Sequence, residues 1–357
     1  MKIMQVMPEF GLAGAEIMCE NLMVGLKELG HEVFAVSLYD YHSPITERLE
    51  RNEIKIFYLN KKQGLDLSIY QKLYKIIKRE MPDVVHTHRY VMQYATPVAK
   101  FCRIKKNIHT VHSIAQKEQE PGKRKLARFF YHYWSVIPVA LTKEIQTTIM
   151  EEYGLPEERI PIVFNGESLK RFSPKENYQI GDAFKLLHIG RFQPLKNQML
   201  IVECTAELIE AGLNLEVFLV GDNDNSYGEE VKEAIIAHHL ENKIHLVGLQ
   251  SDVAPMLSQV DLFVLPSQYE GMPMTLIEAM ATGLPVIASA VGGIVDMMNN
   301  NENGLLIQPD KSSLIRSIKE LYDNGQLRMQ LGMQARKRSL SFSSEAMASS
   351  YIEIYKG

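Results

Sequence analysis

The sequence predicts an α/β protein with two domains, each built on a doubly wound parallel β-sheet. The chain has 357 residues, which is more than a single hydrophobic core of ordinary size can organise. Short apolar segments of strand character alternate with helical segments in both halves, which is the pattern of successive βαβ units. A polar stretch at 165–183 carries Asn-Gly and Ser-Pro turn signals and separates the two halves.

The elements of the first half follow one another from the start of the chain. Apolar runs predict strands at 3–7, 31–39, 83–88, 108–113 and 136–142. Helical patterns lie between the early strands, at 15–29 before Gly30 and at 69–79 before Pro82. Because helices join successive strands, we expect the strands to be parallel.

The second half repeats this alternation. Strands are predicted at 185–191, 215–222, 243–248, 263–267 and 285–289, and helices at 197–210, 229–238 and from Pro273 to Gly283. Residues after 312 are largely helical, with a break at 341–344. We therefore expect a first domain at 1–168, a connection at 169–184, a second domain at 185–340 and a last helix at 341–357. Two such domains would leave a cleft between them, where ligand sites are common.

The composition predicts a soluble protein. Hydrophobic residues make up 46% of the chain and charged residues 23%, and the net charge of −4 gives no reason to expect nucleic acid as a partner. Three cysteines show no metal-binding or CxxC spacing, which favours reduced thiols and a cytoplasmic location. No run reaches the roughly 18 apolar residues of a membrane span, and the first residues do not match a secretory signal.

One segment of the chain is much more basic than its net charge of −4 would suggest. Residues 100–128 hold nine basic and two acidic side chains, and the adjoining stretch at 121–136 adds five aromatic residues. Three interpretations stay open: a helix with one buried aromatic face, peripheral contact with an anionic membrane at its inner face, and, least favoured, nucleic acid. The first two are compatible, because the basic face alone could meet lipid headgroups.

Two carboxylates at 267–290 indicate a ligand site. Glu270 follows a strand, in the loop before a helix that we expect to begin at Pro273. Glu278 lies in the second turn of that helix among apolar neighbours, so its carboxylate needs a hydrogen-bond partner or a shifted pKa. Ligands of open α/β sheets bind at the carboxyl ends of strands, and the N–H groups of a helix start suit a phosphate. The two carboxylates are placed to hold two ends of one elongated ligand.

Glycines and cations at other strand ends point to the same chemistry. Gly11 and Gly14 lie between the first strand and the first helix, where a backbone can approach a phosphate. Arg191 ends a strand, and Lys196 precedes Asn197, which we expect to cap the next helix. A forked guanidinium and an ammonium converging there suit a diphosphate.

Histidines also gather at strand ends. His86 and His88 are spaced to share one face of a strand, and no third ligand stands nearby, so we expect core or cleft-edge positions and no metal site. His112 ends the next strand at the mouth of the expected cleft. It is the best histidine candidate for contact with a reacting group.

With these motifs the chain resembles the retaining nucleotide-sugar glycosyltransferases of family four, also called group 1, which have the GT-B fold. The resemblance spans nearly the whole length. It rests on the glycine loop with Ala15-Glu16, on 83–88, on Asn165-Gly166, on Arg171-Phe172-Ser173-Pro174, on Gly190-Arg191, on Lys196-Asn197, on Val220-Gly221-Asp222 and on the Glu270-to-Glu278 element. The fold implied is two Rossmann-like domains facing a central cleft, with the last helix crossing back to the first domain.

The resemblance implies a role for each motif position. Glu270 would contact the hydroxyls of the donor sugar, and Glu278 the ribose. His112 would contact the sugar near the reacting carbon. The diphosphate would be held by Arg191, Lys196, Gly14 and the loop of Gly271, Met272, Pro273, Met274 and Thr275, and the base would face the backbone near Gly248 and Leu249. Met272 and Pro273 stand where Phe-Gly is frequent in the family, which leaves the choice of donor sugar open.

The activity implied is a metal-independent hexosyltransferase that moves a sugar, with retention, from a nucleoside-diphosphate sugar to an acceptor hydroxyl. A UDP- or GDP-sugar would be the donor, with no other cofactor, and the acceptor would be a saccharide or lipid-linked. The setting would be bacterial cell-surface polysaccharide or glycolipid biosynthesis. The alternatives are a nucleotide-sugar epimerase of related fold and a non-catalytic protein that binds sugar nucleotides. A glycosidase, which also pairs carboxylates, would have no use for the cations at 191 and 196.

Overall fold

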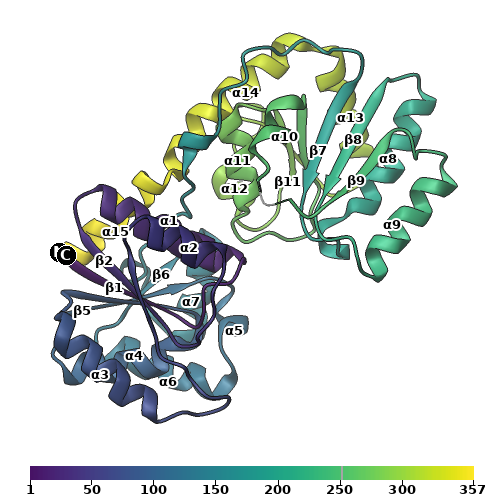
Figure 1. Ribbon diagram of the computed structural model, residues 1–357. Coiled ribbons are helices and arrows are strands. Elements are labelled where there is room, and N and C mark those ends of the chain that lie inside the picture. Colours follow the sequence, from purple (N-terminus) through teal and green to yellow (C-terminus); the bar gives the residue numbers. More distant parts are fainter. Residues whose placement is uncertain (251) are drawn as a thin grey trace. The chain divides into compact units, whose positions relative to one another are not determined.

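The structure is a computed structural model that describes residues 1–250 and 252–357, which pack into two compact units (Figure 1). Unit 1 comprises Met1–Ser168 and Phe342–Gly357, and unit 2 comprises Leu169–Ser341. Each unit is built on one parallel sheet covered by helices, so the predicted α/β class with two parallel sheets is confirmed.

The sheet of unit 1 has six parallel strands in the order β3-β2-β1-β4-β5-β6. Their bounds are β1 Lys2–Met7, β2 Glu32–Ser37, β3 Lys55–Tyr58, β4 Val84–His88, β5 Lys106–Val111 and β6 Ile137–Ala140. Five of these strands were predicted, and β3 was missed. Ile3 and Met7 of β1 enter one hydrophobic core and Met4 and Val6 enter a second, because successive residues of a strand point to opposite faces.

Helices of unit 1 cover both faces of this sheet. They are α1 Gly14–Glu28, α2 Pro44–Arg51, α3 Ser68–Glu80, α4 Met92–Phe101, α5 Ala115–Glu118, α6 Pro121–Tyr133, α7 Lys143–Tyr153 and α15 Ser344–Lys356, with 3₁₀ turns at Arg89–Val91 and Glu157–Arg159. Side chains of α1, α7 and α15 fill the first core, and those of α3 and most of α4 fill the second. The last helix, α15, contributes side chains that complete the core of unit 1.

Two glycines let α15 lie close against unit 1. A Cβ atom on Gly25, in the last turn of α1, would stand 2.7 Å from the carbonyl oxygen of Ser344. A Cβ atom on Gly166 would stand 2.5 Å from the carbonyl oxygen of Ser343. Backbone bonds of 2.9 Å from Glu167 N–H to the oxygen of Phe342, and from Ser344 N–H to the oxygen of Glu167, hold the same contact. Side chains at these two glycine positions would push α15 away.

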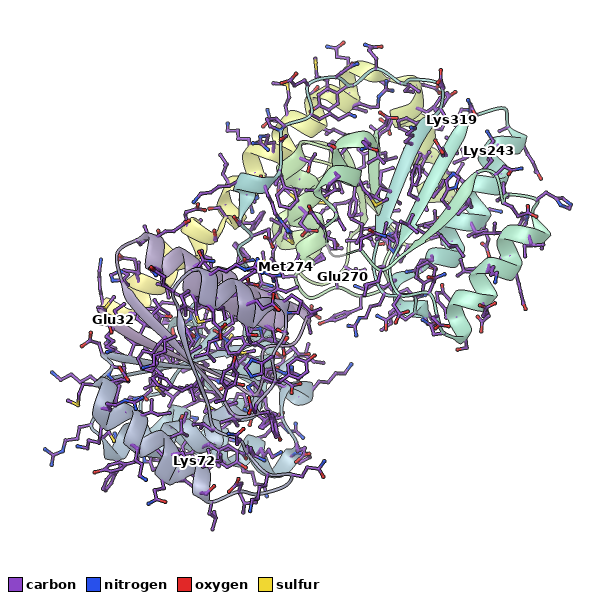
Figure 2. The ribbon with its side chains drawn as sticks, in the orientation of Figure 1. Glu32, Lys72, Lys243, Glu270, Met274 and Lys319 are labelled. Carbon is purple, nitrogen blue, oxygen red and sulfur yellow. The ribbon has the colours of Figure 1, made fainter. Side chains whose placement is uncertain are left out.

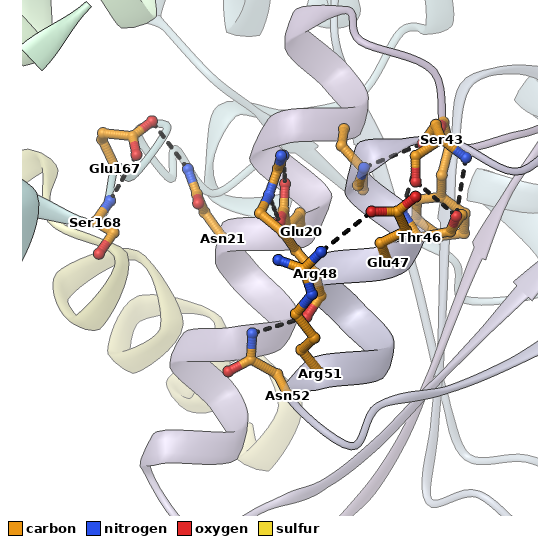
Figure 3. Close-up of polar contacts among 12 residues, drawn as sticks. Glu20, Asn21, Ser43, Thr46, Glu47, Arg48, Arg51, Asn52, Glu167 and Ser168 are labelled. Atoms are coloured by element: carbon orange, nitrogen blue, oxygen red, sulfur yellow. Dashed lines mark hydrogen bonds and ion pairs between the residues drawn. The ribbon is translucent and has the colours of Figure 1, made fainter. Parts of the chain in front are cut away.

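Polar contacts join α1 to α2 and to the end of the first segment of unit 1 (Figure 3). Arg48 of α2 grips the Glu20 carboxylate with Nε and Nη2, at 2.6 and 2.7 Å from its two oxygens. Asn21 Nδ2 donates to the carbonyl of Gly166 at 2.9 Å and to Glu167 Oε2 at 3.1 Å. One turn of α1 thus holds both α2 and the chain just before unit 2 begins.

The sheet of unit 2 also has six parallel strands, in the order β12-β11-β10-β7-β8-β9. Their bounds are β7 Phe184–Ile189, β8 Leu215–Val220, β9 Ile244–Gly248, β10 Leu262–Leu265, β11 Val286–Ser289 and β12 Leu305–Ile307. The five predicted strands are confirmed and β12 was missed. When the strands of each sheet are numbered from its own first strand, both sheets have the order 3-2-1-4-5-6, so two strands lie on one side of the first strand and three on the other.

The helices of unit 2 are α8 Gln198–Glu210, α9 Ser226–Ala237, α10 Ala254–Gln259, α11 Met274–Thr282, α12 Ile294–Met297, α13 Lys311–Asp323 and α14 Gly325–Ser339, with 3₁₀ turns at Leu169–Arg171 and Pro194–Lys196. A further 3₁₀ turn, Leu340–Phe342, leads into α15, at the predicted break. The prediction that Pro273 is the first helical residue is wrong. Its ψ of 118° is extended, so it caps the helix and α11 begins at Met274, whereas Gly283 ends it in the left-handed conformation as expected.

The polar segment at 169–184, expected as a connection between domains, packs on unit 2. Lys175 N–H donates to the oxygen of Thr282 at 2.7 Å, and the Tyr178 hydroxyl donates to the oxygen of Gly283 at 2.8 Å. The Arg328 guanidinium of α14 donates to the Tyr178 oxygen at 2.9 and 3.1 Å. These bonds fasten the segment to the end of α11 and to α14.

Both sheets reverse the direction of strand addition beside their first strand. In unit 1 the reversal lies between β1 and β4, and in unit 2 between β7 and β10. Loops that leave the carboxyl ends of such neighbouring strands diverge to opposite faces of the sheet and leave a crevice in which ligands bind. These two points are therefore where functional side chains are to be sought.

Candidate functional site

An ion pair occupies the reversal point of unit 2. Lys196, in the loop after β7, places Nζ 2.6 and 2.7 Å from the two carboxylate oxygens of Glu270, in the loop after β10. Ser267 Oγ donates to Oε1 of the same carboxylate at 2.7 Å. The side chains of Lys196 and Glu270 are only 19% and 6% exposed, so the contact is shielded from water and stronger than a surface pair.

The two loops are tied to each other by backbone and side-chain bonds. Gln268 N–H donates to the oxygen of Leu195 at 2.8 Å, and Asn197 Nδ2 donates to the oxygen of Pro266 at 3.2 Å. Asn197 stands at the start of α8 as expected, but its left-handed backbone turns the side chain away from the helix N–H groups. Asn197 therefore joins the loops of Lys196 and Glu270 and does not cap α8 with its side chain.

Glu278 has a cationic partner inside unit 2. Its side chain is 10% exposed, and Arg171 Nη2 donates to Oε1 at 2.7 Å. The Glu278 carboxylate, which lies among apolar neighbours, therefore has the hydrogen-bond partner that we expected it to need. That partner, Arg171, belongs to a motif that received no role from the sequence. Glu270 lies in the loop before α11 and Glu278 in its second turn, each beside its own cation.

The start of α11 lies between these carboxylates, and Figure 2 labels Glu270 and Met274 there. Proline carries no side-chain acceptor, so Pro273 leaves the first N–H groups of α11 without a side-chain cap. A Cβ atom on Gly271 would meet no atom within 4 Å. Met272 and Pro273 are buried, and Met274 and Thr275 are partly exposed. The helix start is open, in the arrangement that binds anions in other proteins.

Two further candidates lie in the loops after β7 and β9. Arg191 is exposed, two residues beyond the end of β7, so the prediction that it ends the strand is wrong. Gly248 ends β9 with a positive φ of 76°, and the Leu249 side chain is 75% exposed. Both loops leave the carboxyl ends of unit 2 strands, as the expected site requires.

His188 of β7 was not singled out by sequence reasoning. Its ring is buried, and Nδ1 donates to the oxygen of Val264 in β10 at 2.9 Å. Burial, with Lys196 nearby, lowers its pKa to about 4, so the ring is neutral at pH 7. The His188 side chain joins β7 to β10, the two strands that lead into the loops of Lys196 and Glu270. This role can be recognised only from the adjacency of the two strands in the sheet.

The reversal point of unit 1 has its own charged contact. Gly14 is the first residue of α1, and a Cβ atom there would meet no atom within 4 Å. Arg89, just beyond β4, places Nη1 2.6 Å from Oε1 of Glu16, whose side chain is 2% exposed. The salt bridge joins the first turn of α1 to the loop after β4, beside the open glycine.

The histidines lie at the carboxyl ends of β4 and β5. His86 and His88 are fully buried with ring centroids 4.3 Å apart, which confirms that they share one face of the strand. His112 follows β5, is partly exposed, and places Nε2 2.9 Å from Nδ1 of His88. Among residues 1–250 and 252–357, no group of three or more His, Cys, Asp or Glu side chains is arranged to hold a metal ion.

Burial determines the protonation of this region. It lowers the pKa of His112 to about 3, with His109 and Arg89 adding to the effect, so the ring is a neutral hydrogen-bonding group. It raises the pKa of Glu118 to about 7, although N–H groups of His112 and Ser113 donate to that carboxyl. A carboxyl that titrates near neutral pH therefore lies beside the backbone of His112.

Helix α6 carries the basic-aromatic segment. Phe130 and Tyr131 are buried in the core of unit 1, which confirms the interpretation of one buried aromatic face. Phe129 and Tyr133 are 41% and 72% exposed on the same helix. A shallow hollow there is lined by Lys125, Arg128, Phe129, His132 and Tyr133. Among the described helices, none is long and apolar enough to cross a membrane.

Two protein families match the chain in adjoining parts. The family described as Glycosyltransferase Family 4 matches residues 12–171. The family described as Glycosyl transferases group 1 matches residues 170–338. The first match falls on unit 1 and the first residues of unit 2, and the second match falls on unit 2. Together they include Gly14, His112, Arg191, Lys196, Glu270 and Glu278, whereas Gly11 lies just before the first match.

Curated relatives of similar length include two bacterial enzymes. The UDP-Gal:alpha-D-GlcNAc-diphosphoundecaprenol alpha-1,3-galactosyltransferase of Escherichia coli is 29% identical, over 83% of this chain and 82% of that protein. The N-acetyl-alpha-D-glucosaminyl L-malate synthase of Bacillus anthracis is 26% identical, over 81% of this chain and 78% of that protein.

Solved structures show the same fold along the whole chain. A glycosyltransferase from Rickettsia africae has a TM-score of 0.86 at 22% identity, covering 99% of this chain and 97% of its own. Alr3699/HepE of Anabaena, in complex with UDP, has a TM-score of 0.86 at 18% identity and covers 100% of both chains.

Proposed function

Because the chain belongs to the family 4, group 1 glycosyltransferases of GT-B fold, we propose that it moves a sugar, with retention and without a metal ion, from a nucleoside-diphosphate sugar to an acceptor hydroxyl. The Lys196–Glu270 ion pair beside the open start of α11 carries this proposal. It combines a cation for a leaving phosphate with a carboxylate for sugar hydroxyls at the reversal point of one sheet.

The diphosphate is the proposed ligand of Lys196, Arg191 and the α11 start. Cleavage of the glycosidic bond leaves negative charge on the distal phosphate, and the barrier falls as that charge is stabilised. An ammonium, a guanidinium and the N–H groups of a helix start supply positive potential directly to phosphate oxygens. This set performs the task often given to a metal ion, which is why we propose metal-independent transfer.

The two carboxylates are proposed to hold the two ends of the donor. Glu270, ionised and oriented by Lys196 and Ser267, accepts hydrogen bonds from hydroxyls of the sugar. Glu278, paired with Arg171, accepts from the ribose hydroxyls. The open N–H groups of α11 lie between them for the diphosphate, so one extended donor spans all three.

Retention follows when the acceptor hydroxyl attacks on the face from which the phosphate leaves. The departing phosphate oxygen then removes the proton of the acceptor, and the same oxygen is stabilised by Lys196. His112 of unit 1 is proposed to contact the sugar near the reacting carbon, and Gly14 to approach the diphosphate through the N–H groups of α1.

UDP-sugars are the proposed donors, since the Escherichia coli relative is named for UDP-Gal and the Anabaena structure holds UDP. The acceptor is proposed to be a saccharide carried on a lipid, by the name of the same relative, which fits a role in bacterial surface polysaccharide synthesis. We propose that the exposed basic and aromatic side chains of α6 hold the protein at an anionic membrane surface where such acceptors lie.

A donor screen followed by turnover tests the proposal. UDP-, GDP- and ADP-sugars are added to the full chain, and we expect the UDP-sugar that is the donor to raise the melting temperature most. With a lipid-linked saccharide acceptor, that donor gives a glycosylated product of retained configuration, in the presence of EDTA. Glu270→Gln abolishes product formation, whereas the exposed control Glu241→Gln does not.

Two outcomes contradict the proposal. Conversion of the donor to an epimer in the absence of any acceptor identifies a nucleotide-sugar epimerase. Stabilisation by a sugar nucleotide with no turnover of any acceptor identifies a protein that binds and does not catalyse.

A further inference from the structure

A row of buried hydrogen bonds runs from α15 to His112. We infer that Tyr355 and Gln5, acting through His88, determine which ring nitrogen of His112 carries its proton, so that His112 presents a bare Nδ1 acceptor to a hydroxyl of the donor sugar. The part of this inference that concerns the sugar rests on the proposed function. Tyr355 and Gln5 are positioning residues, because neither is proposed to touch a substrate.

The row consists of three bonds. Gln5 Nε2, from β1, donates to the Tyr355 hydroxyl of α15 at 3.4 Å. Gln5 Oε1 lies 2.8 Å from His88 Nε2, and His88 Nδ1 lies 2.9 Å from His112 Nε2. Gln5 and His88 are fully buried and Tyr355 is 2% exposed, so water does not compete for these partners.

The donors follow from the chemistry of each group. An amide oxygen only accepts, so His88 Nε2 must carry the hydrogen that points at Gln5 Oε1. Burial keeps the pKa of His88 well below its usual value, so its ring holds one proton and Nδ1 is an acceptor. His112 Nε2 must then donate to His88 Nδ1. Since His112 is also neutral, its Nδ1 carries no hydrogen.

The Tyr355 hydroxyl connects this row to a second histidine. It accepts from Gln5 and lies 2.8 Å from His86 Nδ1, to which it donates. His86 Nε2 then donates to Thr110 Oγ1 at 2.8 Å. In this chain of hydrogen bonds each group donates to the next, from His112 through His88, Gln5, Tyr355 and His86 to Thr110. A rotation that exchanges the oxygen and nitrogen of the Gln5 amide would reverse the donor and acceptor in each bond. The orientation of one buried amide thus decides whether His112 Nδ1 accepts or donates.

The free nitrogen of His112 is available to a ligand. His112 as a residue is partly exposed, and its Nδ1 makes no hydrogen bond with any residue that the structure describes. A sugar hydroxyl that donates to Nδ1 would be held beside the carboxyl end of β5. In the reversed arrangement Nδ1 would carry a hydrogen and the same hydroxyl would have to accept, which changes the hydroxyl geometry that the site favours.

Tyr351 provides a matched control on the same helix. It lies one helical turn before Tyr355, is fully buried, and hydrogen-bonds Thr110 Oγ1 at 2.7 Å. Tyr351→Phe and Tyr355→Phe each remove one buried hydroxyl. Only Tyr355→Phe takes the acceptor away from Gln5 and frees its amide to rotate.

The test reads the His112 tautomer directly. The full chain is labelled with ¹⁵N-histidine, the His112 signals are assigned by their loss in His112→Gln, and two-bond ¹H–¹⁵N correlation spectra at pH 7 identify the protonated nitrogen. We expect Nε2–H in the wild type and in Tyr351→Phe. In Tyr355→Phe and in Gln5→Met we expect the signals to shift toward the Nδ1–H form.

Turnover separates this inference from the proposed function. With a working donor and acceptor, Tyr355→Phe lowers kcat by about tenfold, the equivalent of one misdirected hydrogen bond, while KM for the donor stays within about threefold. Protonation of Nδ1 in the wild type, or an unchanged tautomer in both Tyr355→Phe and Gln5→Met, overturns the inference. A tautomer shift in a protein without transferase activity supports it and contradicts only the proposed function.

Discussion

Lys196 and Glu270 form a single contact in which the ammonium nitrogen lies 2.6 and 2.7 Å from the two carboxylate oxygens. The sequence suggested separate roles for them, one at a diphosphate and one at a sugar. In the proposed function the donor contacts both partners of a shielded ion pair, and a change at either residue also affects the other. Ser267 remains as a second donor to Glu270 when Lys196 is removed.

The first prediction is an energetic coupling between Lys196 and Glu270. Lys196→Met leaves a buried carboxylate with too few donors, and Glu270→Gln leaves a poorly compensated ammonium, so each destabilises unit 2. The double variant relieves both problems, and we expect a coupling of about 1–3 kcal/mol in the free energy of unfolding. Urea denaturation of the four proteins measures it.

The exposed pair Lys311–Glu207, whose atoms lie 2.9 Å apart, is the control for this cycle. Its side chains are 47% and 54% exposed, so Lys311→Met and Glu207→Gln should couple by at most about 1 kcal/mol. Equal couplings in the two cycles would show that the Lys196–Glu270 contact has no special strength.

The second prediction concerns the packing of α15. Gly25→Ala places a methyl group against the Ser344 carbonyl, and we expect a loss of about 1–3 kcal/mol despite the better helix propensity of alanine. Gly122→Ala in α6 is the control, since a Cβ atom there meets nothing within 4 Å and the stability should change by less than about 1 kcal/mol. Thermal unfolding compares them, and similar melting temperatures would refute the tight contact.

The third prediction is a pH-dependent gain in stability from Glu118→Gln. Because the pKa of Glu118 is raised from 4.5 to about 7, the folded state binds more protons between these values, and wild-type stability falls as the pH rises through this window. Glutamine does not titrate. Relative to the wild type, the free energy of unfolding of the variant should therefore increase between pH 4.5 and 7, by about 1.4 kcal/mol for each pH unit.

Denaturant midpoints at pH 5, 6, 7 and 8 measure this difference. The exposed Glu151→Gln is the control and should show no such trend. His109 and His112, whose pKa values desolvation lowers to about 3, act in the opposite sense and destabilise the folded state as the pH falls below 6.5. Their contribution cancels in the comparison of variants. A difference that does not change with pH would contradict a raised Glu118 pKa.

The fourth prediction is binding of the protein to anionic vesicles through α6. Lys125→Gln with Arg128→Gln should weaken sedimentation with phosphatidylserine vesicles by about 1 kcal/mol per charge removed. The same loss of two charges in Lys232→Gln with Lys319→Gln, on exposed positions of unit 2, should have no such effect. High salt should weaken wild-type binding. Binding that ignores lipid charge, or equal losses in both double variants, would count against α6.

Local patterns in the sequence predicted most of the fold because buried parallel strands form continuous apolar runs. The two strands that were missed, β3 and β12, lie at sheet edges and are short, with partly exposed residues in their runs. The start of α11 was misplaced by one residue at Pro273. A proline before a helix and one inside its first turn share the same φ and differ only in ψ, which composition does not reveal.

The contacts of the candidate site were beyond local patterns. Glu270 and Lys196 were each predicted, but their contact depends on β7 lying beside β10, which is a property of the strand order. Arg171 as the partner of Glu278 depends on how the segment at 169–184 packs. Gln5 and Tyr355 are separated by 350 residues, so no spacing rule connects them.

The place of α15 in unit 1 has a consequence for folding during translation. Residues 344–356 leave the ribosome only after all of residues 169–341, yet their side chains fill the core of unit 1. Unit 2 is one continuous stretch of chain, and every strand of its sheet has been synthesised before α15 is made. The unit that is synthesised first is thus completed last, and until then the surface at Gly25 and Gly166 that α15 covers stays uncovered.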